Sequence, residues 1–156
     1  MLEKVDFPLT NGQISEFILD KGYTSYFTLQ QAISEMVEAG FIREESTHNR
    51  TMYHLTEEGT ETIQFFKSNI SPAIRSDIDT FLKEKAYELK SEVGVRADYY
   101  PNNANEYSVR CQICEGDATL IDLTISVPTK DEAISVANNW TKRHQEIYAQ
   151  IMASLL

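Results

Sequence analysis

Several features are scarce in this sequence, and each absence excludes a class of protein. The 156 residues include only two cysteines, Cys111 and Cys114, which are too few for a disulfide scaffold. No stretch approaches the roughly 18 apolar residues that a transmembrane helix requires. The first residues, Met1 to Asp6, lack the apolar segment of a signal peptide. We therefore expect a cytoplasmic protein without a membrane partner.

Basic residues are scarce as well. The chain has 14 Lys and Arg against 24 Asp and Glu, which gives a formal net charge of −10. Residues 1–70 hold five basic and eleven acidic side chains, and residues 71–156 hold nine and thirteen. Neutralisation of phosphates supplies most of the non-specific affinity for nucleic acids. Any contact with DNA must therefore depend on a few local groups.

No signature of an enzyme is present, since the sequence has no phosphate-binding glycine loop, nucleophile elbow or two-histidine metal motif. Cys111 and Cys114 have the spacing of half a zinc site or of a redox motif. They fall in a predicted strand, where side chains three residues apart point to opposite faces. We therefore expect Cys111 to be a buried thiol, and we expect neither a metal nor a cofactor.

The first third of the chain predicts two short helices joined by a turn. Thr10 can cap a helix that ends near Gly22, and a second helix ends at Gly40. The apolar stripe of the second helix consists of Leu29, Ala32, Ile33, Met36 and Val37. Two short helices with a glycine in the connecting turn are typical of a helix-turn-helix.

A hairpin and a further helix follow. Residues 41–45 and 51–55 read as strands around the polar turn at 46–50. Thr56 then caps a helix whose first turn carries Glu57 and Glu58, where the helix dipole favours negative charge. The hairpin is in the position expected for a wing.

The second half predicts an α-β-β-β-α arrangement with an antiparallel three-stranded meander. A helix begins at Ser71-Pro72 and extends to about Glu92. Strand-like runs occupy about 93–100, 106–115 and 118–127. Thr129 and Glu132 form a capping box for a last helix, whose apolar stripe continues to Leu155. The predicted class is therefore α+β, with domains at 1–70 and 71–156.

Two runs resemble known bacterial proteins. The run from Tyr53 to Gly59 is similar to the junction of wing and helix in PadR- and MarR-type regulators, which favour Tyr-x-Leu-Thr-x-x-Gly there. The run from Phe7 to Ser15, together with that from Tyr26 to Gln31, resembles the bacterial winged-helix family of domain of unknown function 4364. This resemblance covers nearly the whole chain and implies a winged-helix fold with a regulatory role.

The N-terminus of this sequence differs from the pattern of the proteins that it resembles. Winged helices normally begin with a further helix that packs across the next two. Only Met1 to Asp6 precede Phe7, which is room for a single turn. We therefore expect a winged helix-turn-helix that is truncated at its N-terminus.

The candidate DNA contacts lie on the second helix and the hairpin, because the N-terminal residues of that helix reach base edges in helix-turn-helix proteins. Glutamine can pair with adenine, and Ser or Thr can bond a base or a phosphate. The candidates are Ser25, Tyr26, Thr28, Gln30, Gln31 and Ser34 in the helix, with Arg43, His48, Asn49 and Arg50 in the hairpin. The helix has no Lys or Arg, so an ordinary solvated polar face is the competing interpretation.

Two surfaces of the second half allow more than one interpretation. The outward face of the sheet would group Arg96, Asp98, Tyr100, Arg110, Gln112, Asp122 and Thr124. Three interpretations of this face are open: an effector pocket, a dimer surface, or a solvated face with cross-strand ion pairs. The apolar end of the last helix is either intermolecular or part of the core.

From these observations we expect a homodimeric winged-helix transcriptional regulator that binds double-stranded DNA. Residues 1–70 would bind DNA, and residues 71–156 would form a dimerisation or effector module. The alternative is a winged-helix module that binds another protein instead of DNA.

Overall fold

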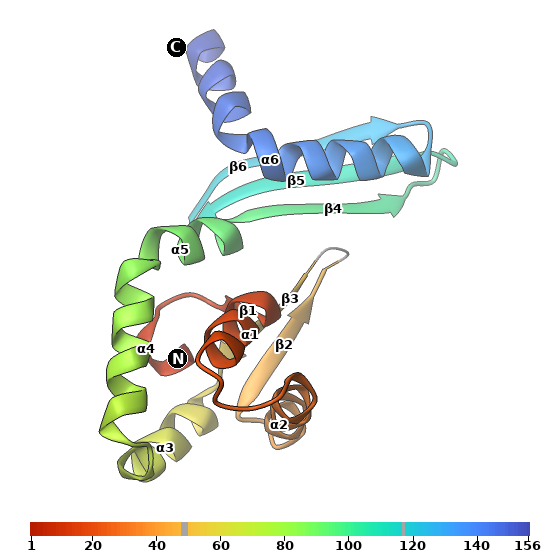
Figure 1. The fold of residues 1–156 in the computed structure, drawn as a ribbon. Coiled ribbons are helices and arrows are strands. Elements are labelled where there is room, and N and C mark those ends of the chain that lie inside the picture. The colour runs from red at the N-terminus through yellow and green to blue at the C-terminus, as the bar shows by residue number, and fades with distance from the viewer. Residues whose placement is uncertain (48–49, 117) are drawn as a thin grey trace. The chain divides into compact units, whose positions relative to one another are not determined.

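The computed structural model describes residues 1–47, 50–116 and 118–156. In this part of the chain six α-helices and two antiparallel three-stranded sheets form a mixed α+β protein, which confirms the predicted class. The chain divides into two compact units, unit 1 (Met1–Val93) and unit 2 (Gly94–Leu156). Figure 1 shows the elements of each unit. None of the described helices has both the length and the apolar character needed to span a bilayer.

Unit 1 consists of short helices and one small sheet. In chain order its elements are a 3₁₀ turn at Leu2–Lys4, β1 Leu9–Thr10, α1 Asn11–Asp20, α2 Tyr26–Glu38, β2 Ile42–Ser46, β3 Thr51–Leu55, α3 Glu57–Phe66, a 3₁₀ turn at Lys67–Asn69, α4 Pro72–Glu84 and α5 Ala86–Gly94. Thr10 and Gln13 form a capping box for α1, which confirms Thr10 as the cap. Gly22 and Gly40 have φ of 67° and 75°. These values are in the left-handed region, which often follows the end of a helix and which glycine adopts most easily.

The sheet of unit 1 has the order β1-β3-β2, and its β2–β3 hairpin is the predicted one, with β2 displaced by one residue from the predicted range. β1 was not predicted, because the sequence there indicates only the start of a helix. Leu9 pairs with Tyr53 and Thr10 with Met52, which lie more than 40 residues away. Leu9 and Met52 are fully buried where the two strands pair, and this burial stabilises the strand. A strand of two residues is too short to show a periodic pattern in the sequence.

The boundary between the units differs from the predicted one after residue 70. Helices α4 and α5 belong to unit 1, because Ile78, Leu82 and Leu89 pack around Phe17 of α1. The Nε2 atom of Gln13 also donates a hydrogen bond to the carbonyl oxygen of Leu89 at 3.1 Å. The single helix predicted over this region is two helices, which are separated at Lys85.

Unit 2 is the predicted meander with a helix on one face. Its elements are β4 Val95–Pro101, β5 Tyr107–Glu115, β6 Ala118–Val127 and α6 Lys130–Leu155, and the strand order is β4-β5-β6. Thr129 and Glu132 form the predicted capping box of α6. Figure 1 shows α6 lying along the sheet and its last turns projecting away from it.

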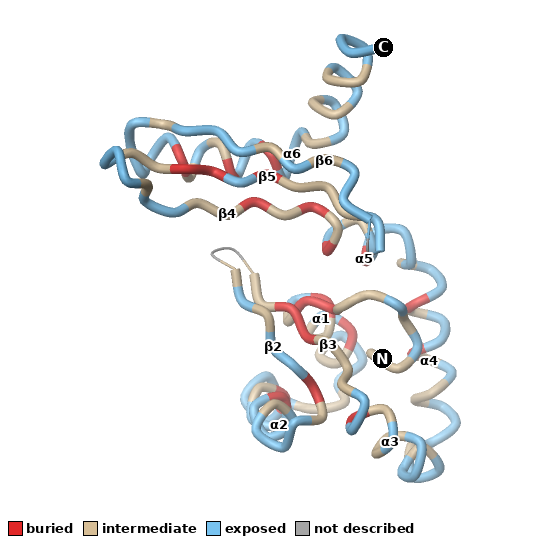
Figure 2. Tube along the Cα trace, turned by 180° about the vertical axis from the view of Figure 1, so that it is seen from behind, coloured by how far each residue is buried: buried red, intermediate tan, exposed pale blue. Residues whose placement is uncertain are grey.

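The core of unit 2 lies between α6 and the inner face of the sheet. Val109 and Cys111 of β5 contact Ala137 and Trp140 of α6, and all four are buried. The buried stretches lie on β4, β5 and α6, whereas β6 is exposed over most of its length (Figure 2). The predicted apolar stripe of α6 is buried only in its first half, since the side chain of Leu155 is 77% exposed.

Candidate nucleic-acid interface

The first turn of α2 presents a small polar and aromatic surface. Ser25 caps the helix by accepting a hydrogen bond from the backbone N–H of Thr28 at 3.3 Å, and the two hydroxyl oxygens lie 2.9 Å apart. Beside them Tyr26 is 52% exposed and Phe27 is 83% exposed, with their rings in edge-to-face contact at 5.9 Å. Ser25, Tyr26 and Thr28 were predicted as contacts from the sequence but Phe27 was not, although Phe27 is an apolar residue outside the apolar stripe of the helix.

The two glutamines of α2 have different environments. Gln30 forms a reciprocal pair with Asn11, in which each amide nitrogen donates to the other side-chain oxygen at 2.9 Å. This pair joins the first turn of α1 to α2 and occupies the amide that was expected to contact a base. Gln31 is exposed, and its Nε2 atom donates to Glu35 within the same helix at 2.9 Å. The side-chain oxygen of Gln31 remains available, and Ser34 is exposed one turn further along.

Among the described residues of the hairpin, one cation is exposed. Arg43 lies in β2 with an exposed side chain. Arg50 is half-buried, and its guanidinium donates a hydrogen bond to the carbonyl oxygen of Glu92 near the end of α5. A cation is favourable at that end of a helix, so Arg50 has a structural role. His48 and Asn49 lie outside the described residues.

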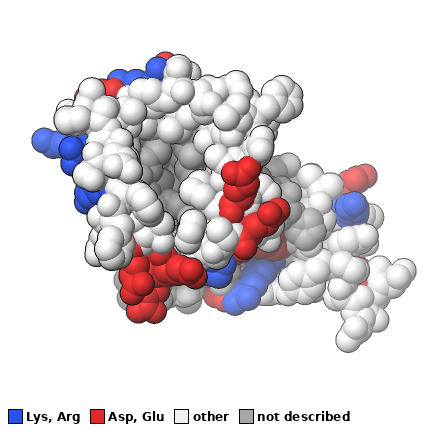
Figure 3. Space-filling model, turned by 90° about the horizontal axis from the view of Figure 1, so that it is seen from below, with Lys and Arg blue, Asp and Glu red and all other residues white. Residues whose placement is uncertain are grey.

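The charge around α2 is negative or neutral. The helix carries Glu35 and Glu38 and has no basic residue. Unit 1 as a whole contains nine Lys and Arg against sixteen Asp and Glu. Figure 3 views the molecule from the side on which α2 and α3 lie in Figure 1, and the described Lys and Arg side chains form small separate groups there. This face has no continuous positive stripe among the residues described.

Thr56 and Gly59 hold the hairpin against α3. Thr56 accepts a hydrogen bond from the N–H of Gly59 at 3.1 Å, and its hydroxyl lies 2.7 Å and 2.9 Å from the carbonyl oxygens of Gly40 and Phe41. A Cβ atom on Gly59 would lie only 2.0 Å from the Phe41 carbonyl oxygen. The Leu-Thr-x-x-Gly pattern therefore has a physical reason: threonine caps the helix, and glycine allows the close approach of two backbones.

An apolar cavity of about 340 Å³ lies among α1, α2 and α3. Its lining is almost entirely aliphatic and aromatic, with Ile14, Ile33, Leu55 and Ile63 as representative side chains. The N-terminal turn at Leu2–Lys4 lies at the edge of this cavity, and Leu2 packs against the Leu29 cluster.

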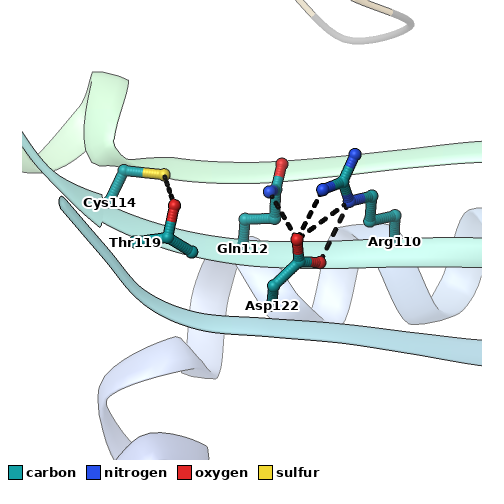
Figure 4. Close-up of polar contacts among 5 residues, drawn as sticks. All are labelled: Arg110, Gln112, Cys114, Thr119 and Asp122. Atoms are coloured by element: carbon teal, nitrogen blue, oxygen red, sulfur yellow. Dashed lines mark hydrogen bonds and ion pairs between the residues drawn. The ribbon is translucent and has the colours of Figure 1, made fainter. Parts of the chain in front are cut away.

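The outer face of the unit 2 sheet contains a hydrogen-bonded ion pair between Arg110 and Asp122. The Nε atom of Arg110 donates to Asp122 at 3.0 Å, and the side chain of Gln112 donates to the same carboxylate at 3.0 Å (Figure 4). The hydrogen bond from Arg110 lowers the pKa of Asp122, and the same contact raises the pKa of Arg110. The charges therefore satisfy each other, as expected of cross-strand pairs on a solvated face.

The two cysteines lie on opposite faces of β5, as predicted. Cys111 is in the core, where burial raises the pKa of its thiol to about 11. Cys114 lies on the face of Arg110 and Gln112, with its sulfur 3.9 Å from the hydroxyl of Thr119 (Figure 4). A single metal ion cannot bind both thiols in this arrangement. The described residues contain no group of three or more metal-ligating side chains.

Comparisons with known proteins give one result. Neither the curated proteins nor the solved structures contain a match to the chain. A model of the family described as "domain of unknown function (DUF4364)" matches residues 1–155, which is nearly the full length. The protein therefore belongs to the DUF4364 family.

Proposed function

We propose that the protein is a homodimeric transcriptional regulator whose unit 1 is a winged helix that binds double-stranded DNA. The observation that carries this proposal is the arrangement of unit 1. Two helices, α1 and α2, are joined by a turn at Gly22, and the antiparallel hairpin β2–β3 and the capped helix α3 follow. This order is that of helix-turn-helix proteins with a wing, in which the second helix enters the major groove.

The exposed side chains of α2 are suited to base and phosphate contacts. Ser25, Thr28 and Gln31 are exposed near its N-terminal end, and Ser34 is exposed one turn further along. Gln31 is the residue that we assign to base readout, because the Gln30 amide is bonded to Asn11. The acidic composition of unit 1 requires the affinity to come from such short-range contacts and from two matched half-sites in a dimer.

Base readout by Gln31 is tested with Gln31→Ala and a matched control, Gln64→Ala, which removes an exposed glutamine from α3. Duplexes are first selected from a random library with the wild-type protein, and binding is then measured by fluorescence anisotropy. Gln31→Ala should weaken binding by about 1–3 kcal/mol, mainly at one base position, because one amide contact is lost. Gln64→Ala should leave affinity unchanged.

Arg43 tests the phosphate contact in the same assay. Arg43→Ala should weaken binding to all duplexes and reduce the slope of log affinity against log salt by about one unit. Sequence preference should stay the same, because a phosphate contact carries no sequence information. Absence of binding to any duplex at low salt would contradict the proposal as a whole.

A second function, binding of a basic protein partner, is favoured by one observation. Phe27 is 83% exposed beside Tyr26 on a helix without Lys or Arg, and unit 1 is strongly acidic. Exposed aromatic residues are enriched at the centres of protein interfaces. Phe27→Ala would then abolish binding of Lys- and Arg-rich peptides, while Phe65→Ala, which removes an equally exposed phenylalanine from α3, would not.

A further inference from the structure

The free edge of the unit 2 sheet contains an unprotected segment. β6 (Ala118–Val127) is ten residues long and, among the described strands, pairs with β5 alone, so one side of its backbone has no described strand beside it. Proteins usually protect such edges with Lys, with Pro, with short strands or with β-bulges. β6 has a bulge at Leu120, but its segment from Ile121 to Val127 is regular and contains no Lys, Arg, Pro or Gly. The one charged residue of this segment, Asp122, is paired with Arg110. The opposite edge, β4, carries Arg96, Asp98 and Pro101.

The inner face of β6 is also incompletely covered. Helix α6 packs chiefly on β4 and β5, and the core residues of the sheet come from those two strands. The inward side chains of β6 are Ile121, Leu123, Ile125 and Val127, and none of them is buried. Ile125 is 38% exposed although it lies opposite the fully buried Val109. An apolar strip therefore runs along the free edge.

We propose that β6 of a second copy of this chain pairs antiparallel with β6, so that two three-stranded sheets become one six-stranded sheet. A strand pairs with its own copy through a two-fold axis perpendicular to the sheet. Residues directly opposite each other in an antiparallel pair point to the same face of the sheet. The axis must therefore pass between one residue of β6 and the same residue of the second copy. The proposed surface deepens the homodimer proposed above, and it depends on unit 2 alone.

The regular part of the β5–β6 pairing and the charge on β6 point to one register. This pairing is regular from Ile121 to Val127, and beyond it Cys114 pairs with Thr119, so Leu120 is an extra residue that forms a bulge in β6. The centre of the regular segment is Thr124. An axis at Thr124 places the two Thr124 side chains opposite each other, which is a favourable cross-strand pair. It also places Asp122 opposite Ser126 of the second copy and so avoids two opposed carboxylates.

The inner face is complementary in the same register. Leu123 lies opposite Ile125 of the second copy, and Ile121 lies opposite Val127. Four apolar side chains from each copy then form one continuous strip across the new strand pair. Pairs of β-branched and aliphatic residues at opposed positions stabilise a sheet and become less accessible to water. A second copy is therefore a fitting occupant of this edge, both in backbone and in side chains.

The register is tested by cysteine cross-linking of the full chain. Thr124→Cys is made in a Cys114→Ser background, and the buried Cys111 is retained. Opposed residues of an antiparallel pair have Cα atoms about 4.5–5.5 Å apart, which is within the range of a disulfide. Thr124→Cys should form a cross-linked dimer under mild oxidation. The control is Ser126→Cys on the same face of the same strand, whose copies would be displaced by about 13 Å along the strand and should not cross-link.

The assembly is tested by light scattering. The wild type should have twice the monomer mass of 17.8 kDa, and Ile125→Lys should have the monomer mass. Ile125→Val should remain a dimer, and circular dichroism checks that each variant is folded. A dimer without a Thr124 cross-link, equal cross-linking at Ser126, or a folded Ile125→Lys that remains dimeric would each overturn the proposed surface. So would a wild-type monomer. None of these results depends on DNA binding, which the anisotropy assay tests separately.

Discussion

Gly59 lies where helix α3 meets the backbone that enters the hairpin, and Gly59→Ala tests how tightly the two are packed. A Cβ atom on this residue would be 2.0 Å from the Phe41 carbonyl oxygen and 2.9 Å from a methyl group of Leu55. The leucine methyl group can move by a rotamer change, but the carbonyl is part of the chain. It accepts hydrogen bonds from the N–H of Thr56 at 3.1 Å and from its hydroxyl at 2.9 Å.

The expected cost follows from these contacts. Relief of the clash requires α3 or Phe41 to move by more than about 1 Å, and overpacking of this kind typically costs about 1–3 kcal/mol. If Phe41 moves, two hydrogen bonds of about 1 kcal/mol each weaken as well. Alanine in a helix recovers about 1 kcal/mol relative to glycine. We therefore expect Gly59→Ala to lower the free energy of unfolding by about 2 kcal/mol.

Urea unfolding followed by circular dichroism measures this change, and Gly12→Ala is the matched control. Gly12 is also in a helix, but a Cβ atom there would meet only the Thr10 hydroxyl at an ordinary 3.6 Å. Its replacement should leave stability unchanged or raise it by up to about 1 kcal/mol. Equal stability of the two variants would refute the close packing of α3 on Phe41.

Three further results are expected. One thiol of the native chain should react with a thiol reagent at neutral pH and two after denaturation, because Cys111 is buried with its pKa raised to about 11; two fast thiols would contradict this. The Tyr23 hydroxyl donates to Asp77 at 2.6 Å and lowers the pKa of that carboxyl. This stabilisation is present above the ordinary pKa of Asp and is lost as the carboxyl protonates. In urea titrations the difference in free energy of unfolding between the wild type and Asp77→Asn should therefore disappear below about pH 4. A difference that does not depend on pH would refute this. A double-mutant cycle of Asn11→Ala and Gln30→Ala should give a coupling of about 0.5–1.5 kcal/mol, and additive effects would disprove the amide pair.

The sequence predicted the elements whose signals are local. Thr10, Thr56 and Thr129 cap the helices that they were expected to cap, because a capping side chain bonds a backbone group only three residues away. Gly22 and Gly40 end α1 and α2 for an equally local reason. The three strands of unit 2 were predicted to within two residues at their ends, since they are long and bounded by turns.

Features that depend on distant partners could not be predicted in this way. β1 exists because Leu9 is buried against β3, and nothing within a few residues of Leu9 indicates a strand. The candidate site has the same limitation. Gln30 and Arg50 are polar side chains in suitable positions, yet their partners, Asn11 and Glu92, are 19 and 42 residues away along the chain. Only the fold shows that these two groups are already bonded within the protein.

Helix α6 has a consequence for truncated forms of this protein. It is 26 residues long and supplies the second layer of unit 2. Terminal residues of a domain usually tolerate deletion, unless they are docked. A chain that stopped after Val127 would keep all three strands but would leave Val109 and Cys111 open to water on an uncovered sheet. A nonsense or frameshift mutation that removes α6 would therefore disrupt the core of unit 2 even though all three strands are still made.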